Sequence, residues 1–356
     1  MYRKLVTAHY LLFAFLFLLA SCVSPSTSPH QTSLIVYRFD PPAFLEYSAD
    51  YHLTKEIPFS IPPSCGLFDI FSAPIGQFVL IELSCPNGQT VLFMDVESAS
   101  VSQPISNTDS HFLAWMGDGK SAYLKTDSLG SPQIVRVYMD GTKGILAVTE
   151  FTYDLAAKPN SHDFTFTLSR GLGSGSELYF AQHDGRIATL LYSDPYNYIS
   201  FARFSPDGKQ IVFIKTPDTQ TPFTVGELWM MDSDGSNARK LADVDAGHGY
   251  AANWSIDGKR IAFVMRENPE DENADQSSKA LISNVYVVNI ETGVLTQVTH
   301  LANDRAETPY WSSDGNTLAF NMVINGRMIV SIADAATGDI KPLETGSTCC
   351  PVWMRK

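Results

Sequence analysis

The sequence has little positive charge for its length. Its 356 residues include 25 Lys and Arg against 38 Asp and Glu, which gives a formal net charge of −13. No patch or stripe rich in Lys and Arg is visible. This argues against binding of nucleic acid and against direct electrostatic docking on anionic lipid. We interpret the acidic surface as a solubility feature.

Common catalytic motifs are also missing. The sequence contains no P-loop, no dinucleotide fingerprint, no H-E-x-x-H and no G-x-S-x-G nucleophile elbow. The nearest approach to an elbow is LGSGS at residues 172–176, whose spacing is wrong and which we predict to be a loop between strands. The sequence therefore predicts no catalytic residue, no cofactor and no metal ligand.

The first 33 residues are typical of export. Arg3 and Lys4 precede an unbroken apolar run, Leu11–Ala20, which is too short to favour a membrane-spanning helix. LASC at residues 19–22 resembles the bacterial lipobox, which implies a signal peptide over 1–21 and a lipidated Cys22. Residues 22–33 then form a flexible tether rich in Ser, Thr and Pro. We predict a protein anchored by lipid to a bacterial membrane, on its periplasmic or extracellular face; the alternative is an ordinary secretory signal.

The rest of the chain is organised around one stretch that reads as four short strands. It runs from FARFSPDGKQIVFIKT at Phe201 to GELWMMDSDGSNARKLA at Gly226. Pro-Asp-Gly and Asp-Gly turns separate strands in which apolar and polar residues alternate. A single meander of this kind cannot bury its faces alone, so we expect further copies.

Copies of this unit recur along the chain. HFLAWMGDGKSAYLKT begins at His111, YAANWSIDGKRIAFVM at Tyr250 and ETPYWSSDGNTLAFNM at Glu307. Asp-Gly pairs fall between the expected strands, starting at Asp118, Asp140, Asp184, Asp207, Asp234, Asp257 and Asp314. The pattern resembles the TolB-type β-propeller repeat, sharply from about residue 199 to 343 and more weakly before that. The resemblance implies an all-β propeller of four-stranded antiparallel blades over residues 34–356.

The ends of the chain predict a shared blade. Residues 33–59 supply three strands, and TCCPVWMRK at 348–356 matches the first strand of a repeat, with Trp353 in the aromatic position. We expect one blade built from both termini to close the ring. Aromatic residues of the inner strands predict seven blades, at Phe71, Trp115, Tyr153, Phe204, Trp254, Trp311 and Trp353. Six blades is the alternative. The acidic insertion at 267–279 is expected to be a solvated outer loop.

Four cysteines remain besides Cys22, and an exported protein permits disulfides. Cys65 and Cys85 flank a hairpin, so a symmetric register would place them opposite each other. Cys349 and Cys350 begin the last strand. They pair with Cys65 across blades, form a vicinal bridge or stay reduced; the sequence leaves these alternatives open.

The residues at the starts of the inner strands are expected to meet at one end of the channel. Two histidines, two carboxylates, a tyrosine and an arginine there form a candidate binding site for a polar ligand, with His111 and His248 sharing it. A hydrated ring of polar side chains is the alternative. The candidate residues are His111, Glu150, Tyr198, His248, Arg305 and Glu307.

Two classes of function are consistent with the sequence. The first is a non-catalytic scaffold of the cell envelope, a monomer whose propeller face binds a protein partner or polar ligand. Resemblance to TolB implies such docking, although TolB also carries an N-terminal α/β domain where this chain has a short tether. The second is a lyase or hydrolase acting on carbohydrate or peptide at the channel mouth, because related propellers occur in pectate-lyase-like and prolyl-oligopeptidase-type enzymes. We expect no hydrolase domain in this chain.

Overall fold

The chain divides into two units, residues 1–30 and 31–356. The computed structural model describes residues 32–105, 109–127, 132–146, 148, 151–218, 224–246 and 250–355, all in the second unit. Cys22, Glu150 and His248 lie outside the described residues. The second unit is almost entirely β, as the alternating apolar pattern predicts.

Within the described residues the strands form seven groups of four, each with antiparallel neighbours. The first three groups are β28 (Thr348–Arg355), β1 (Thr32–Phe39), β2 (Pro42–Ser48) and β3 (Leu53–Pro58); β4 (Gly66–Ser72), β5 (Phe78–Cys85), β6 (Gly88–Asp95) and β7 (Ser100–Ser102); and β8 (Ser110–Trp115), β9 (Ser121–Thr126), β10 (Gln133–Tyr138) and β11 (Lys143–Ile145).

The remaining four groups follow in chain order. They are β12 (Thr152–Ala157), β13 (Phe164–Ser169), β14 (Ser176–Gln182) and β15 (Ile187–Asp194); β16 (Asn197–Phe204), β17 (Gln210–Pro217), β18 (Val225–Asp232) and β19 (Arg239–Asp245); β20 (Asn253–Trp254), β21 (Arg260–Arg266), β22 (Ser283–Asn289) and β23 (Leu295–Gln297); and β24 (Arg305–Trp311), β25 (Thr317–Ile324), β26 (Arg327–Asp334) and β27 (Ile340–Pro342). A parallel bridge between Ser283 and Arg305 joins the last two groups into one eight-stranded sheet.

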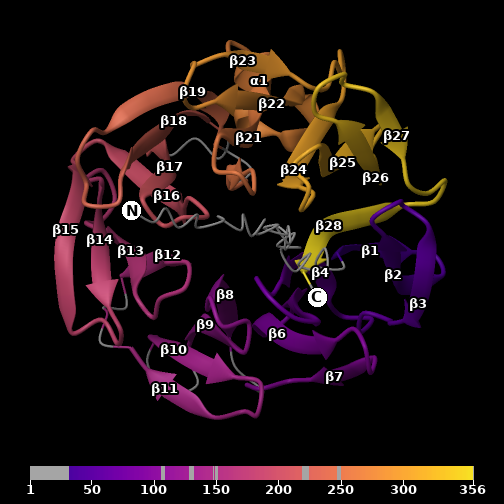
Figure 1. Cartoon of the computed structure of the whole chain (residues 1–356), viewed down its shortest axis with the longest axis horizontal. Helices are drawn as coiled ribbons and strands as arrows, with labels where there is room; N and C mark the ends of the chain where they lie inside the picture. Colours follow the sequence, from indigo (N-terminus) through magenta and orange to yellow (C-terminus); the bar gives the residue numbers. More distant parts are fainter. Residues whose placement is uncertain are drawn as a thin grey trace, which may run out of the picture. The chain divides into compact units, whose positions relative to one another are not determined.

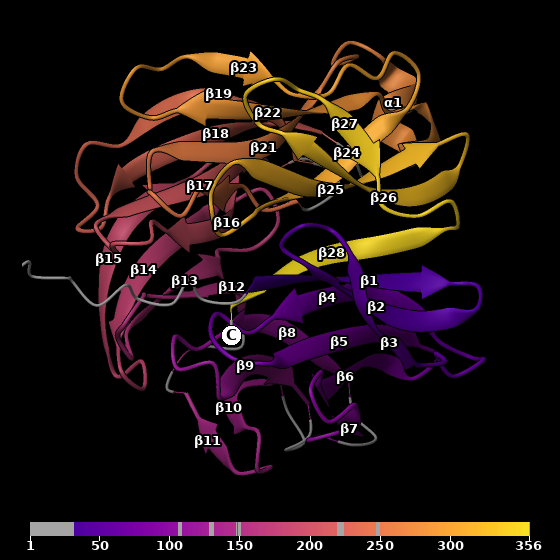
Figure 2. The same ribbon diagram turned by 45° about the vertical axis from the view of Figure 1, so that its right-hand side comes forward.

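Figure 1 shows these groups following one another around a common axis, with the first strand of each group nearest to it. We call these strands, β28, β4, β8, β12, β16, β20 and β24, the inner strands. Figure 2 shows β28 and β1 between the groups of β24 and β4, and β28 contacts both inner strands. Apolar clusters fill the spaces between neighbouring groups, for example Val91, Phe93, Trp115 and Leu124 between the groups of β4 and β8.

The strand from the C-terminal end lies where the sequence predicts it. β28 pairs antiparallel with β1, and the register places Leu34 opposite Trp353. The side chain of Trp353 is 9% exposed, and its indole N–H donates to the carbonyl of Tyr310 in β24, at 3.2 Å. The prediction that residues 348–356 supply the fourth strand of the first group is confirmed for Thr348–Arg355, the part that the structure describes.

The same indole hydrogen bond recurs between other groups. Trp115, Trp254 and Trp311 donate to the carbonyls of Phe71, Arg203 and Asn253, at 3.0–3.1 Å. Because the partner always lies on the preceding inner strand, these bonds fix how neighbouring groups pack. We call the place of these tryptophans in the inner strand the indole position.

Backbone hydrogen bonds show which residues take the indole position elsewhere. In the hairpin that joins the first two strands of a group, the residue after the indole position donates its N–H to the carbonyl of the residue five positions further on. Ala73 donates to Phe78 in this way, and Lys158 donates to Asp163. The indole position is therefore Ser72 in β4 and Ala157 in β12. Phe71 and Tyr153 do lie on inner strands as predicted, but their assignment to the common aromatic position is wrong. Phe71 precedes that position by one residue and Tyr153 by four.

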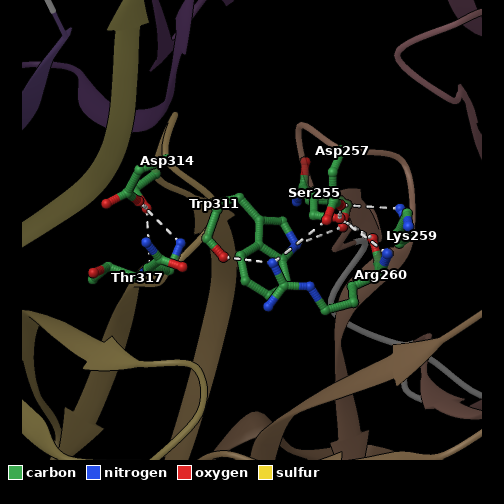
Figure 3. A network of polar contacts seen from close by, with 11 residues as sticks. Ser255, Asp257, Lys259, Arg260, Trp311, Asp314 and Thr317 are labelled. Carbon is green, nitrogen blue, oxygen red and sulfur yellow. Dashed lines mark hydrogen bonds and ion pairs between the residues drawn. The ribbon is translucent and has the colours of Figure 1, made fainter.

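The Ser-x-Asp-Gly turn of the repeat has one set of bonds wherever it occurs. Ser255 donates to Asp257 at 2.5 Å and accepts the N–H of Arg260 at 2.9 Å, while Asp257 accepts the N–H of Lys259 at 3.1 Å. Serines 205 and 312 repeat both Ser bonds. Figure 3 shows this turn, with the guanidinium of Arg260 lying against the indole of Trp311, 4.6 Å from the ring centre. The turn therefore links one group to the next.

The acidic insertion is more ordered than the sequence predicts. It contains α1 (Glu272–Gln276) and the 3₁₀ helix η1 (Ser278–Ala280), and Ala274 is fully buried. Arg266, also buried, forms ion pairs with Asp275 at 2.7 Å and with Asp245 at 3.3 Å. The insertion is largely exposed to solvent, as predicted, but its short helix is tied to β21 through Arg266 and Asp275 instead of being an irregular loop.

Candidate functional site: an acidic, aromatic cavity

A cavity of about 630 Å³ lies where the inner strands bulge. In most groups the pairing between the inner strand and the second strand shifts register, as at a β-bulge. The shift lies close to the residue that is three positions before the indole position, and we call that residue's place the bulge position. Its φ is positive at Phe201, Thr308 and Cys350. The bulge residues that line the cavity are Asp69, Phe112, Asp154, Phe201, Ala251 and Thr308. The extra residue turns these side chains into a shared space.

The cavity wall combines aromatic rings with an excess of carboxylates. Its acidic side chains are Asp69, Glu82, Asp109, Asp127 and Asp154, and its basic ones are His111, Lys125 and Arg203. Besides the aromatic bulge residues, the rings of Phe68, Phe71, Tyr153, Tyr250 and Tyr310 line it. The stacked rings of Phe71 and Phe112 lie 4.2 Å apart. Such a wall suits a ligand that has both apolar surface and positive charge.

His111 is the predicted site residue that reaches the cavity. Its Nδ1 lies 3.5 Å from Glu82 Oε1, and its Nε2 lies 3.3 Å from Asp109 Oδ2. The contact with Glu82, helped by the Asp109 charge and opposed by burial, raises the pKa of His111 above 6.5. Glu82 is 2% exposed, and protonation of His111 compensates this buried carboxylate. His111 is held by the wall rather than free in the cavity.

Three other predicted residues lie behind the wall. The ring of Tyr198 meets the cavity residue Tyr153 edge-on, with centroids 6.0 Å apart. Arg305 donates through Nε to buried Glu307 and through Nη1 to the carbonyl of Ser278, at 2.9 Å. Burial, followed by the charge of Glu307, raises the pKa of the cavity residue Tyr250 far above 10. The structure thus places these residues around the cavity but not in its lining, while Glu150 and His248 lie outside the described residues.

Asp69 is a cavity residue that the sequence analysis missed. Its Oδ1 accepts the N–H of Ile70 at 2.8 Å, and within the described residues no Lys, Arg or His forms an ion pair with it. Burial raises its pKa from 3.8 to about 7, opposed by the Ile70 bond and reinforced by the charges of Glu82 and Glu307. Asp69 is therefore about half ionised near neutral pH.

Asp154 occupies the same bulge position two groups further on, with different partners. Its Oδ2 accepts the N–H of Ala202 at 3.0 Å, and its Oδ1 lies 3.3 Å from Nη1 of Arg203. The guanidinium of Arg203 also lies 6.0 Å from the ring centre of Phe201. Asp154 is thus a compensated carboxylate, whereas Asp69 is an uncompensated one.

The sequence held a signal for these two aspartates. Each lies three residues before the indole position of its inner strand, where the other strands have Phe, Ala, Thr or Cys. The position could be recognised only after the register of Phe71 and Tyr153 had been corrected. The sequence predicts site residues at the strand starts, whereas the bulge brings residues further along each strand into the cavity.

The cysteines form two bridges away from the cavity lining. Cys65 is joined to Cys85 by an S–S bond of 2.03 Å, and Cys349 is joined to Cys350 as a vicinal pair. Both pairs belong to one apolar cluster between the groups of β28 and β4. In the described part of the chain, no three His, Cys, Asp or Glu side chains gather as a metal site would require. No helix there is both long and apolar enough to cross a membrane.

No family model matches the chain. A segment of 70 residues is 39% identical to dipeptidyl-peptidase 5 of Porphyromonas gingivalis, and a segment of 143 residues is 26% identical to the uncharacterized peptidase YuxL of Bacillus subtilis. These matches cover 19% and 33% of this chain, but only 10% and 21% of the respective relatives.

Solved structures resemble most of the chain. TolB from Acinetobacter baumannii is 18% identical to this chain, with a TM-score of 0.52. The likeness covers 88% of this chain and 79% of the TolB chain. An oligogalacturonate lyase in complex with manganese is 12% identical, with coverages of 85% and 86% and a TM-score of 0.60. A prolyl endopeptidase is 10% identical, with coverages of 90% and 50% and a TM-score of 0.60.

These likenesses show the class of fold. The chain is an all-β protein of repeated four-stranded blades with a TolB-like propeller fold. At these identities the neighbours share a fold with this chain and do not assign it an activity.

Proposed function

We propose that the chain is a non-catalytic binding propeller of the bacterial cell envelope, which docks a protein partner at the end where its inner strands begin. We call this end the mouth. In this proposal Cys22 carries the lipid anchor, and the propeller is a closed ring of seven blades. The pairing of β28 with β1 and the bond from Trp353 to Tyr310 support closure, and seven groups of four strands support that count over six.

The observation that carries the docking proposal is where the exposed aromatic residues lie. The described aromatic side chains with large exposed surface are Phe39, Phe68, Phe151 and Tyr196, at 43–79% exposure. Phe68 lies in the first half of inner strand β4, and Phe151 and Tyr196 directly precede inner strands β12 and β16. Phe39 ends β1 beside the start of β28. All four therefore lie at the mouth.

The opposite end exposes aliphatic side chains instead. Leu53, Ile75, Ile187 and Val294 lie at or next to the turns there, at 48–63% exposure. Aromatic residues are enriched in protein interfaces and dominate their energetics, whereas scattered aliphatic residues are normal on a surface. The mouth, where the cavity residue Phe68 is also exposed, is thus the better candidate for a partner surface.

The enzymatic alternative is favoured by likeness to the folds of a lyase and a peptidase and by partial sequence matches to two peptidases. An oligogalacturonate carries a carboxylate on each sugar, and the cavity wall holds five carboxylates, so the two would repel each other. The charge of the cavity suits a cationic group better.

The proposal is tested by affinity purification of the full-length protein from detergent-solubilised envelopes of its source. Three proteins are compared: the wild type, a mouth variant with Phe151→Ser and Tyr196→Ser, and a matched control with Ile187→Ser and Val294→Ser at the opposite end. We expect one stoichiometric protein with the wild type and the control, and its loss from the mouth variant. Equal recovery with all three, or no stoichiometric protein with the wild type, would contradict the proposal.

A further inference from the structure

We infer that the cavity binds a primary ammonium group, such as that of a lysine side chain, and that the Asp69 carboxylate receives it. The inference rests on the proposed function, because it names the chemistry that a partner would bring to the mouth. It concerns a small part of the wall around Asp69 on β4, close to Glu82 on β5, Phe112 on β8 and Glu307 on β24.

Among the described carboxylates of the wall, Asp69 and Asp127 form no ion pair, and Asp127 is exposed to solvent whereas Asp69 is half-buried. Glu82 and Asp109 share His111, at 3.5 and 3.3 Å, and Asp154 has Arg203 at 3.3 Å. Asp69 has a single backbone donor, Ile70, and no ion pair within the described part of the chain. Desolvation of a carboxylate is costly unless a cation compensates it. A bound ammonium group would supply that compensation.

The groups that face Asp69 from neighbouring strands add negative charge or none. Glu82 on β5 and Glu307 on β24 both act to raise its pKa, although Arg305 neutralises part of the Glu307 charge. Burial raises the pKa of Tyr310 on β24 well above its usual value, so this phenol is neutral. The potential at Asp69 therefore favours a cation from outside the wall.

The surrounding rings select an organic cation over a bare metal ion. Phe71 follows Asp69 by two residues and stacks on Phe112 at 4.2 Å, and Tyr310 completes an apolar border. Ring faces attract alkylammonium groups and pack against their methylene stems. Hard metal ions need several oxygen ligands, and no three candidate ligands gather within the described residues.

Hydrogen-bond capacity favours ammonium over guanidinium. Asp69 Oδ1 already accepts the Ile70 N–H, which leaves Oδ2 as the less occupied oxygen. A guanidinium binds a carboxylate best through two parallel bonds to both oxygens, whereas an ammonium binds as a point charge. A volume of about 630 Å³ also accommodates a lysine side chain together with neighbouring residues of its segment.

The test is calorimetric titration of the full-length protein with Nα-acetyl-lysine methylamide. The uncharged analogue Nα-acetyl-norleucine methylamide serves as the ligand control. We expect the lysine probe to bind at pH 8 and the norleucine probe not to bind. Asp69→Asn should abolish binding at pH 8, whereas Glu291→Gln, an equal charge change at an exposed site, should leave it unchanged.

The dependence on pH gives a second readout. If Asp69 must be ionised, lowering the pH from 8 to 5.5 should weaken binding about 30-fold, since its carboxylate fraction falls by that factor for a pKa of about 7. The pKa of His111 is raised above 6.5, and its protonation as the pH falls would also repel the probe, so the comparison with Asp69→Asn at pH 8 identifies the Asp69 contribution.

The inference and the proposed function fail in different ways. Equal binding of the lysine probe to Asp69→Asn, no binding at pH 8, or Asp69-dependent binding of Ca²⁺ or Mg²⁺ in place of the amine would overturn the inference. Capture of a stoichiometric partner that persists in Asp69→Asn would then leave the proposed function standing. Probe binding without any captured partner would instead indicate a free small amine as the ligand and contradict the docking proposal.

Discussion

The molecule has two halves that differ in how regular their blades are. In the groups from β16 to β27 each first hairpin carries the Ser-x-Asp-Gly turn with its repeated hydrogen bonds. In the groups from β4 to β15 the serine of that turn is replaced by Ala73, Met116 and Lys158. Two of these groups also lack an aromatic residue at the indole position, where they have Ser72 and Ala157. The groups from β16 to β27, the regular half, thus keep the repeat. The groups from β4 to β15, the irregular half, depart from it.

The charges of the cavity follow the same division. Every acidic side chain of its wall, together with His111 and Lys125, comes from the irregular groups. The groups from β20 to β27 contribute uncharged lining such as Asn253 and Thr308. Arg203 on β16 is the exception and pairs with Asp154 across the boundary. The regular blades thus supply a stable frame, and the departures from the repeat coincide with the candidate site, as is common where function competes with fold consistency.

The largest expected effect tests whether the two halves are joined in the same way. Trp353→Ala should lower the free energy of unfolding by about 3–5 kcal/mol, because a large buried side chain is lost. Trp115→Ala, in the irregular half, should cost a similar amount because it makes the same indole bond. Trp353→Phe should cost about 1 kcal/mol, for the hydrogen bond alone. Chemical denaturation measures all three, and a cost near zero for Trp353→Ala would contradict the shared blade.

The next effect concerns a turn that keeps its glycine in the irregular half. A Cβ at Gly119 would lie 2.2 Å from the carbonyl oxygen of Ile75 in the preceding group, and its φ is +62°. Gly119→Ala should therefore cost about 2–3 kcal/mol, from strain and displacement of the neighbouring turn. Gly141→Ala is the matched control, since φ is also positive but nothing lies within 4 Å; it should cost about 1 kcal/mol. Equal costs would show that the close approach to Ile75 is unimportant.

A smaller effect is expected in the regular half. Ser255→Ala removes a donor to Asp257 and an acceptor for the N–H of Arg260 at a buried site. We expect a loss of about 1–2 kcal/mol, measured by thermal unfolding. Ser312→Ala should behave alike, while Ser102→Ala, at an exposed outer strand, should change little. If Ser255→Ala matched Ser102→Ala, the turn bonds would not distinguish the two halves energetically.

The last effect has the opposite sign. The folded protein holds the Asp69 proton up to about pH 7, whereas the unfolded chain releases it near pH 4, so this group destabilises the fold progressively as pH rises between those values. Asp69→Asn removes that penalty. We expect a melting temperature a few degrees above that of the wild type at pH 8 and equal to it near pH 4. A variant that is less stable at pH 8 would show that the Asp69 charge is compensated.

Much of the fold could be predicted from the sequence because its determinants are local. Asp-Gly turns and alternating strands located the four-stranded units, and VWM at the C-terminal end matched TPYW well enough to place β28 beside β1. The predictions for Phe71 and Tyr153 were wrong because the sequence does not show which face of an inner strand an aromatic residue occupies. Only the backbone bonds of the hairpins fix which residue faces the next blade.

The candidate site was harder to predict, because it depends on contacts between blades. His111 was found, since a histidine at a strand start is conspicuous. Asp69 was missed because its chemistry depends on Glu82, Glu307 and Tyr310, which come from two other strands. Its position three residues before the indole position could be recognised only with the register of Phe71 that the hairpin hydrogen bonds give.

The most direct test of this account is the ionisation of Asp69. Infrared difference spectra between the wild type and Asp69→Asn, recorded from pH 4 to 9 without ligand, isolate the carboxyl band of that residue. We predict a midpoint at about pH 7, as expected for a half-buried carboxyl group with no positive partner and with Glu82 and Glu307 nearby. A midpoint near pH 4 would mean that Asp69 is solvated or already paired, and the case for a cation site in the irregular half of the molecule would be contradicted.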